Sequence, residues 1–389
     1  MKNPCGNYVT MAVKTNTKAH SIGIIGGSLQ SAVGYSHFVA CTMDNRWKIE
    51  AGCFSSKQEA NEITANAYGL PEGRLYNSWK DLLNDEKGRL DAIVVLTPTP
   101  AHFEIVNTAM DMGFPVICEK ALATNGDEIE ELVRQKEKKK SFLAVTYNYS
   151  AYPIIRELQK KISEGELGKI CHFQIEMPQQ GYSITDGDGN RPTPQKWRLS
   201  SGKVPLIHLD LAVHLHHLIY FLTGYRPKGI VSQQGTYGFF PDVVDNVYCI
   251  CNYEEDIQGQ MWFSKSAIGH RNGLRVRVYG SKASAEWYQM NPEELVLSHI
   301  DGRREIIDRS SSSVSQYTRD FGRFKPGHPE GFLEAFANLY SDLADGLEEY
   351  KETGKWELEE YYGSDIALEG LRMLEGMVNS HEKKVWIEL

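Results

Sequence analysis

The feature that most constrains the fold is an alternation of short apolar runs with helix-like patterns over residues 20–148. The predicted strands are residues 21–26, 48–54, 92–96, 116–118 and 142–146, and the predicted helices are residues 30–42, 57–68, 100–112 and 127–139. Such alternation is typical of βαβ units that form a parallel sheet. Right-handed crossovers would place the loops that follow the strands along one edge, where open parallel sheets bind their ligands.

Beyond residue 148 the pattern becomes that of an antiparallel sheet. A helix is expected at residues 153–165, and residues 170–177 then alternate apolar with polar side chains, as a half-buried strand does. Further strands are expected at residues 246–252, 258–264, 274–279, 295–300 and 303–309, with a hairpin turn at Asp301-Gly302. We therefore predict an α/β domain with an open, mainly antiparallel sheet at residues 149–389, whose uncovered face is available for an oligomer interface.

A glycine-rich turn links the first predicted strand to the first predicted helix. It reads Gly26-Gly27-Ser28-Leu29-Gln30-Ser31-Ala32-Val33-Gly34, a partial match to G-x-G-x-x-G with serine at the second and third positions. Small residues let the backbone approach a pyrophosphate and present amide groups at a helix N-terminus, although a purely structural turn is the alternative. Its place at the start of a βαβ array favours the nucleotide. We predict a Rossmann NAD(P)-binding domain at residues 20–148, with cofactor contacts at Gly26, Gly27, Ser28, Leu29 and Gln30.

The end of the second strand bears on the choice between NAD and NADP. An acidic side chain there would bond the 2′-hydroxyl of NAD, but the chain reads Ser55-Ser56-Lys57. Two hydroxyls and a lysine suit a 2′-phosphate, and the alternative is that Ser55 and Ser56 cap the following helix. The sequence predicts NAD or NADP and leaves the choice open.

Composition and charge exclude several classes of function. The length of 389 residues suggests roughly two domains. A net charge of −9 argues against a general nucleic-acid binder. No stretch reaches the roughly 18 apolar residues of a membrane span. Residues 1–19 lack an apolar run of signal-peptide length, and we expect an N-terminal extension there.

The cysteine pattern indicates reduced thiols. The chain has 7 cysteines, an odd number, scattered without a Cys-x-x-Cys pair. This pattern predicts a cytoplasmic protein rather than a disulfide framework or a zinc site. Cys249 and Cys251 lie on one face of a predicted strand, where we expect them to be small buried apolar residues.

Three motifs follow one another along the chain. They read Thr97-Pro98-Thr99-Pro100-Ala101-His102, then Cys118-Glu119-Lys120-Ala121, and then Asp210-Leu211-Ala212-Val213-His214. In this order and spacing, from about residue 20 onward, the chain resembles the Gfo/Idh/MocA family, the relatives of glucose-fructose oxidoreductase and inositol dehydrogenase. It departs from the family pattern at Ala121, where proline is usual, and at Ala212, where glycine is usual.

The resemblance implies an NAD(P)-dependent oxidoreductase that transfers hydride between nicotinamide and a hydroxyl carbon of a sugar, polyol or sugar derivative. It places Lys120 beside the nicotinamide and the reacting hydroxyl, where a lysine can hydrogen-bond an alcohol or help to deprotonate it. Taken alone, this lysine would be interpreted as a solvated charge after a strand. The further cofactor contacts that the resemblance implies are Thr97, Pro98, Thr99, His102 and Glu119.

A histidine-rich segment carries the third motif. Asp210, His214 and His217 are spaced by four and three, so they share one face of a helix. By resemblance, Asp210 and His214 contact substrate hydroxyls, and His214 acts as general acid and base together with Lys120. His217, where the family has aspartate or asparagine, would contact substrate. A metal site that includes His208 and a helix with buried, satisfied imidazoles are the alternatives; we predict no metal, because hydride transfer to nicotinamide needs none.

Other polar and aromatic residues are predicted to contact substrate. They are Tyr147, Asn148, Trp197, Arg198 and His328. An aromatic face and a guanidinium after the Gly/Asp/Pro-rich loop at residues 181–194 suit a sugar ring or an anionic substituent. His328 is expected to open a helix beside the cleft. Each has packing or capping as the alternative.

Two rival functions share the same sequence features. One is a redox-assisted glycosidase in which a retained NAD transiently oxidises the sugar. The other is a cofactor-binding regulator that has lost catalysis, a possibility that the presence of both Lys120 and His214 disfavours. The family resemblance further implies a homodimer or homotetramer, and no nucleic-acid or membrane partner is expected.

Overall fold

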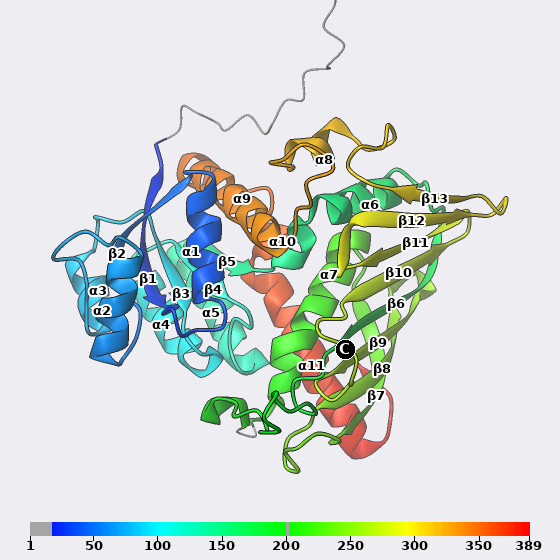
Figure 1. The fold of residues 1–389 in the computed structure, drawn as a ribbon, viewed down its shortest axis with the longest axis horizontal. Helices are drawn as coiled ribbons and strands as arrows, with labels where there is room; N and C mark the ends of the chain where they lie inside the picture. The colour runs from blue at the N-terminus through cyan, green and yellow to red at the C-terminus, as the bar shows by residue number, and fades with distance from the viewer. Residues whose placement is uncertain (1–17, 200–201) are drawn as a thin grey trace, which may run out of the picture.

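The computed structural model describes residues 18–199 and 202–389, which contain two sheets with helices between them (Figure 1). The first sheet has the order β2-β1-β3-β4-β5, and its strands pair in parallel. Its strands are β1 (His20–Gly26), β2 (Trp47–Cys53), β3 (Ala92–Leu96), β4 (Val116–Glu119) and β5 (Leu143–Thr146). The predicted Rossmann-type parallel sheet is therefore confirmed. The extension expected at residues 1–19 lies outside the described residues as far as residue 17.

Helices flank this sheet because its central strands are apolar on both faces. All residues of β3 and β4 are buried, as in a parallel sheet that is covered on both sides. The helices are α1 (Gly34–Met43), α2 (Gln58–Ala67), α3 (Trp79–Asp85), α4 (His102–Asp111) and α5 (Gly126–Lys139). Helix α3 was not predicted, because a segment of 7 residues is too short to show a helical period.

The first helix begins later than the sequence pattern predicted. We expected it from residue 30, but α1 starts at Gly34. Gly26 and Gly27 have φ values of 85° and 70°, so the chain leaves β1 in a left-handed turn that disfavours other residues. The Ser31 hydroxyl then accepts hydrogen bonds from the Val33 and Gly34 amides, which fixes the start of the helix.

The second sheet is long and mainly antiparallel, as predicted. Its order is β13-β12-β11-β10-β6-β9-β8-β7-β14, and β6 with β9 is its parallel pair. The strands are β6 (Ile170–Pro178), β7 (Pro227–Gly235), β8 (Asn246–Tyr253), β9 (Gln258–Ser264), β10 (Arg275–Gly280), β11 (Ala283–Tyr288), β12 (Asn291–His299), β13 (Arg304–Ile307) and β14 (Ile387–Glu388). Strands β7, β11 and β14 were not predicted.

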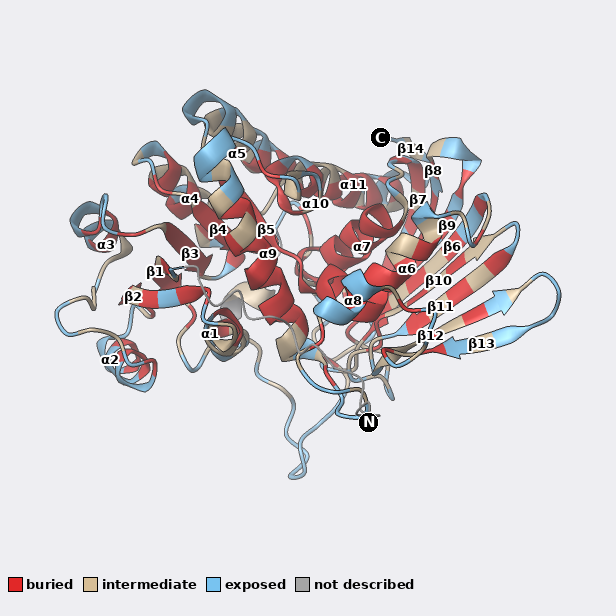
Figure 2. Cartoon of the chain, turned by 90° about the horizontal axis from the view of Figure 1, so that it is seen from above, coloured by how far each residue is buried: buried red, intermediate tan, exposed pale blue. Residues whose placement is uncertain are grey.

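Helices cover one face of the second sheet and leave the other face open. The helices between the two sheets are α6 (Pro153–Ser163), α7 (Val213–Thr223) and α11 (Ser364–Lys383) (Figures 1 and 2). Strand β8 alternates buried with exposed residues, and Figure 2 shows the same alternation on its neighbours. Cys249 and Cys251 are on its buried face, as expected. The open face carries Tyr248 and Ile250, which are 49% and 53% exposed.

The C-terminal part of the chain returns to the first sheet. Helix α9 (Phe332–Thr353) packs on α1, and the Trp47 indole N–H donates to the Tyr340 carbonyl at 2.7 Å. The shorter helices are α8 (Gln316–Asp320) and α10 (Glu359–Tyr362). We propose that the two domains divide near residue 148, between β5 and α6. Within residues 18–199 and 202–389, no helix combines the length and apolar character that crossing a bilayer requires.

Candidate active site

A cavity lies where the ends of the first sheet's strands meet the start of α7. The three residues predicted to be catalytic, Lys120, Asp210 and His214, all line it. Lys120 follows β4, Asp210 lies in a π-helical turn (η4, His208–Ala212), and His214 lies in the first turn of α7. The rest of the lining is formed by Val33, Glu119, Asn148, Tyr149, Met177, Gln179, Leu211, Phe332 and Phe336.

Lys120 bridges the two domains by bonding the π-helical turn. Its ammonium donates to the Asp210 carbonyl at 2.8 Å and to the Asp210 Oδ1 at 3.1 Å. The lysine side chain is 13% exposed, so it is neither a surface charge nor sealed from the cavity. The peptide bond from Lys120 to Ala121 is cis. These contacts bring together two residues that are 90 positions apart in sequence.

Two further cations converge on the same carboxylate. The Lys265 ammonium is 2.6 Å from Asp210 Oδ2, and the Arg198 guanidinium is 3.5 Å from that oxygen. With Lys120 on Oδ1, three cations surround one acid. Arg198 was predicted from the sequence, whereas Lys265 was missed. Lys265 lies in none of the three motifs, and a lysine after a strand, taken alone, is interpreted as a solvated charge.

The electrostatics of the cavity keep its two acids ionised. Burial opposes ionisation of Asp210, but Lys120, Lys265 and Arg198 hold the pKa of its carboxyl well below the usual value. Burial likewise opposes ionisation of Glu119, and contact with His37 together with the charge of Lys120 lowers the pKa of that carboxyl. Glu119 also accepts a short hydrogen bond of 2.5 Å from the Thr146 hydroxyl.

His214 is held as a neutral imidazole beside Lys120. Burial, and then the charge of Lys120, lowers the pKa of His214 well below its usual value. The edge of its ring faces Tyr149 at a centroid distance of 4.7 Å, and its Nδ1 has no hydrogen-bond partner among the described residues. A neutral imidazole at the wall of a cavity can accept a proton from a bound hydroxyl group.

The other histidines of the segment lie in the core. His217 stacks on the ring of Tyr147 at a centroid distance of 4.0 Å, and its Nε2 lies 2.9 Å from the Tyr361 carbonyl oxygen. His217 and Tyr147 were both predicted to contact substrate, but neither of them lines the cavity. His208 is fully buried against Phe263. His216 contacts Glu369 at 3.0 Å and is not part of the cavity lining. Among the described residues, no group of three or more His, Cys, Asp or Glu side chains is placed to hold a metal ion.

These buried histidines make a testable contribution to acid stability. Burial lowers the pKa of His208 and of His217 to about 3. The folded-state pKa is below the unfolded value of about 6.5, so the unfolded chain binds more protons below that pH. Their contribution to the free energy of unfolding is therefore complete above about pH 6.5 and falls as the pH drops. We expect each of the two buried histidines to lower the free energy of unfolding by about 2 kcal/mol at about pH 5, relative to its value above about pH 6.5.

Urea denaturation at several pH values measures this effect. We expect His208→Leu to flatten the fall in the free energy of unfolding between about pH 6.5 and 5 by that amount. The exposed His172, changed to leucine, is the control for losing a histidine as such. An unchanged slope in the His208 variant would contradict the prediction.

The glycine turn after β1 fits a close approach of the backbone to a nucleotide. A Cβ on Gly27 would lie 2.7 Å from the Leu96 side chain, and a Cβ on Gly34 would lie 2.2 Å from the Gly27 carbonyl oxygen. The turn is therefore pressed onto the end of β3. There the Thr97 hydroxyl is buried without a hydrogen-bond partner among the described residues, a group that a ligand would satisfy. Ser28 is half-buried, and Leu29 and Gln30 are exposed.

The remaining residues predicted near the cofactor have mixed environments. The Ser55 hydroxyl accepts a hydrogen bond from the backbone amide of Lys57, the N-cap residue of α2, and no side chain of the described residues caps the first amides of that helix. Ser56 and Lys57 are exposed. His102 is buried, with its two ring nitrogens 2.8 and 2.7 Å from the Ala121 and Thr97 carbonyl oxygens. It therefore ties together the loops after β3 and β4. Thr99 is buried as well, and Pro98 is exposed.

The remaining substrate predictions divide between the cavity and the surface. Asn148 lines the cavity, and its amide nitrogen has no partner among the described residues. The Arg198 guanidinium lies over the Trp197 ring at 4.6 Å. His328 was expected to open a helix, but α9 begins at Phe332 and His328 is exposed in a loop. The His328 carbonyl accepts a hydrogen bond from the Arg309 guanidinium, so it is bonded to a side chain and not to a helical backbone amide.

Two family models match the chain over most of its length. Residues 20–147 match the model of the oxidoreductase family with an NAD-binding Rossmann fold, and residues 155–286 match the GFO/IDH/MocA C-terminal domain. The chain belongs to the Gfo/Idh/MocA family. The family resemblance predicted from the three motifs is thus confirmed, and with it an NAD-binding oxidoreductase domain.

Relatives within the Gfo/Idh/MocA family include sugar and polyol dehydrogenases. An inositol dehydrogenase homologue from Azotobacter vinelandii, solved with NADH and myo-inositol, is 25% identical with a TM-score of 0.87, over 96% of this chain and 98% of that one. The uncharacterised oxidoreductase YfiI of Bacillus subtilis strain 168 is 28% identical over 94% of this chain and 95% of its own length. Levoglucosan dehydrogenase of Pseudarthrobacter phenanthrenivorans is 24% identical, over 72% and 76%.

Proposed function

We propose that this protein is an NAD(P)-dependent dehydrogenase that transfers hydride between nicotinamide and a hydroxyl carbon of a sugar, polyol or sugar derivative. The observation that carries this proposal is the convergence of Lys120, Asp210 and His214 on one cavity at the nucleotide-binding edge of a parallel sheet. The substrates of the relatives support the same class of reaction. A bound nicotinamide would supply the hydride acceptor or donor.

The chain's own residues manage the hydroxyl proton. The Lys120 ammonium donates a hydrogen bond to the reacting oxygen, and this stabilises negative charge there as the proton leaves. The neutral imidazole of His214 takes that proton in oxidation and returns it in reduction. Asp210 orients Lys120 through its carbonyl and carboxylate and accepts hydrogen bonds from neighbouring substrate hydroxyls.

The residues present fit NAD or NADP without deciding between them. Gly26, Gly27, Ser28, Leu29 and Gln30 would hold the pyrophosphate, and Thr97, Pro98, Thr99 and Glu119 would surround the nicotinamide ribose and ring. The end of β2 carries no acid, and the side chains of Ser56 and Lys57 are exposed there, Lys57 at the N-cap of α2. His102 supports this site by positioning two of its loops.

A turnover assay over sugars, polyols and nucleotide-linked sugars tests the proposed function. We expect one or more compounds to reduce NAD⁺ or NADP⁺ in stoichiometric amounts, followed by absorbance of the reduced nucleotide. Release of free sugar from a glycoside without accumulation of reduced nucleotide would establish the redox-assisted glycosidase instead. Nucleotide binding without turnover of any compound would favour the silent regulator.

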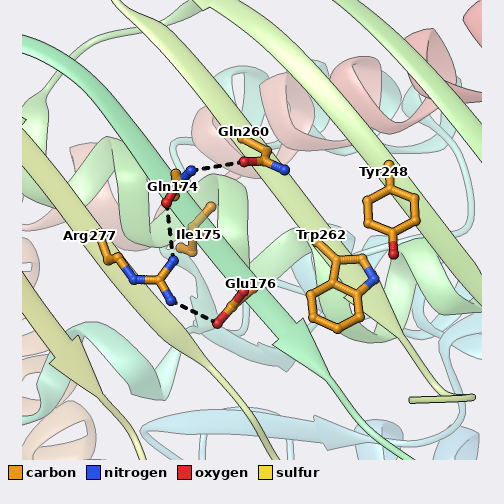
Figure 3. A pocket seen from close by; sticks show the side chains of 7 residues that line it. All are labelled: Gln174, Ile175, Glu176, Tyr248, Gln260, Trp262 and Arg277. Atoms are coloured by element: carbon orange, nitrogen blue, oxygen red, sulfur yellow. Dashed lines mark hydrogen bonds and ion pairs between the residues drawn. The ribbon is translucent and has the colours of Figure 1, made fainter.

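We further propose that the open face of the second sheet joins copies of this chain in a homodimer or homotetramer. Figure 3 shows its polar centre, where Arg277 contacts Gln174 and Glu176 and the ring of Tyr248 lies beside that of Trp262. Beside this centre Tyr248 and Ile250 are about half exposed and lie next to each other on one strand. Protein–protein interfaces commonly combine a core rich in aromatic and apolar side chains with a polar rim, and this sheet face carries both kinds of group.

Light scattering after size exclusion tests the interface. We expect the wild-type protein to elute as a dimer or tetramer and Ile250→Arg to shift it to a smaller species, because a charge in an apolar contact is costly to desolvate. Ile63→Arg is a matched control, because Ile63 is similarly exposed on α2, at 52%. A monomeric wild-type protein would contradict the proposal.

We infer a cytoplasmic location from the cysteines. Cys41, Cys53, Cys118, Cys171, Cys249 and Cys251 are free, and all except Cys171 are buried. Free thiols spread over both sheets suit a reducing compartment. Cys5 lies outside the described residues.

A further inference from the structure

The Asp210 carboxylate, which lines the cavity, is surrounded by more positive charge than the proposed chemistry uses. Lys120 is required to polarise the hydroxyl group, but Lys265 and Arg198 also lie on Asp210, at 2.6 and 3.5 Å from its Oδ2. Asp210 contributes one negative charge against three positive ones. Among the described residues, Asp210 is the only carboxylate that forms an ion pair with any of these three cations.

Two other acids in this region, Glu119 and Asp245, have hydrogen-bond partners of their own. Glu119 accepts a hydrogen bond from Thr146 and lies 3.4 Å from His37, on the side of α1. Asp245 is buried, and its carboxylate accepts hydrogen bonds from the backbone amides of Tyr237 and Gly238. His214, whose pKa is lowered well below its usual value by burial and then by the charge of Lys120, stays neutral and offsets no charge.

Lys265 is buried behind the cavity-lining Asp210 rather than placed on the surface. It directly follows β9, and the residue is 9% exposed. Its amide donates to the Asp245 carbonyl at 2.7 Å, and its carbonyl accepts from the Tyr182 amide at 2.8 Å. A lysine buried to this extent is rare unless it has a partner, since an unpaired ammonium is costly to desolvate.

The surroundings of Lys265 connect it to the cavity and supply a further donor. Gln179 lines the cavity, and its amide donates at 2.7 Å to the carbonyl of Ser264, the residue before Lys265. The ammonium lies 5.5 Å from the centre of the Tyr182 ring. The Tyr182 hydroxyl is buried without a hydrogen-bond partner among the described residues. A donor left unpaired beside two cations is a group that an anion would satisfy.

We propose that Lys265 and Arg198 form an anion subsite and that the substrate is a sugar or polyol that carries a carboxylate or phosphate group. This inference rests on the proposed function and specifies its substrate class. When substrate binds, the anionic group takes the place of the Asp210 carboxylate as partner of Lys265 and Arg198. The planar guanidinium, backed by the Trp197 ring, suits two parallel hydrogen bonds to such a group.

Binding of paired ligands to the NADH-loaded full chain tests the subsite without relying on turnover. The pairs are D-glucuronate with D-glucose and D-glucose 6-phosphate with D-glucose, which separate a carboxylate from a phosphate, and calorimetry measures each Kd. We expect the wild-type protein to bind at least one anionic member roughly 10-fold or more tightly than its neutral partner, because hydrogen bonds to charged groups are the stronger class.

Variants assign this preference to Lys265. We expect Lys265→Met to reduce the ratio of the paired Kd values by roughly 10- to 100-fold. Lys265→Arg, which keeps the charge, should restore most of the ratio. Lys203→Met is the matched control, because Lys203 is a 60% exposed lysine paired with Asp127 and Glu375 outside the cavity. Thermal melts confirm that each variant is folded.

The outcomes separate the subsite from the proposed function. Equal binding of both members of each pair, or a preference that Lys265→Met retains, would overturn the anion subsite even if neutral polyols are oxidised. Preferential anion binding that is lost in Lys265→Met would establish the subsite even if no compound reduces NAD⁺ or NADP⁺. In that case the proposed dehydrogenase activity would fail alone.

Discussion

Lys120→Met lowers kcat for alcohol oxidation by roughly 10²- to 10⁴-fold, the range expected when a positioned proton-transfer or oxyanion-stabilising group is lost. The physical reason is its position. Its ammonium is fixed by the Asp210 carbonyl and carboxylate, at 2.8 and 3.1 Å, and still lines the cavity. Methionine keeps the length of the side chain and removes the charge and the donor.

Steady-state rates at saturating nucleotide measure the Lys120 effect. The nucleotide Kd should change by less than about threefold, since the pyrophosphate would be held by the glycine turn rather than by this lysine. Lys203→Met, on an exposed lysine, serves as the control. A Lys120→Met enzyme that keeps kcat within about threefold of the wild type would rule out the proposed role of this residue.

His214→Gln has the second-largest expected effect, a fall in kcat of roughly 10²-fold or more. Glutamine retains hydrogen-bonding capacity but cannot take up the hydroxyl proton. The wild-type protein should also show a characteristic pH profile. Because the pKa of His214 is well below its usual value, the imidazole stays unprotonated as the pH falls from about 8 to 6.5 and beyond. Its protonation therefore causes no loss of oxidation rate in that range.

A pH series for kcat distinguishes a proton acceptor from a structural histidine. The His214→Gln rate should rise with pH, as hydroxide or buffer replaces the missing base. His172→Gln, on the exposed surface, is the control and should reproduce the wild-type profile. A wild-type kcat that falls tenfold for each pH unit below 6.5, and a His214→Gln variant that does not, would show that His214 titrates normally and contradict the assigned environment.

The local pattern of the sequence predicted the first sheet well. Its buried strands appear as continuous apolar runs, so β1 to β5 were each identified within a few residues. The start of α1 was predicted too early, because Ser31 fixes the helix start through two backbone amides, a contact that periodicity does not contain. In the second sheet β7, β11 and β14 were missed, because β14 has only 2 residues and β7 contains glycine and glutamine rather than an apolar alternation.

In the candidate site, too, local sequence pattern did not predict the tertiary contacts. Helical spacing placed Asp210, His214 and His217 on one face of a helix. Asp210, in a π-helical turn, and His214, in the first turn of α7, do both line the cavity. His217, three residues further along α7, instead stacks on Tyr147 in the core, a tertiary contact that helical spacing does not contain. Lys265 was missed because its partner, Asp210, is 55 positions away, and its signal was only its place after a strand.

The sequence by itself determined the family, the parallel nucleotide-binding sheet and the residue types that carry the chemistry, because these depend on local periodicity and on motifs of fixed spacing. Only the tertiary structure decided which charged side chains lie in contact with one another. The surplus of cations around Asp210 arises from β4, β9 and the segment near residue 198, which are remote in sequence and converge only when the two sheets pack across their shared helices. Electrostatic interactions depend on distance in space, and chain order does not encode that distance.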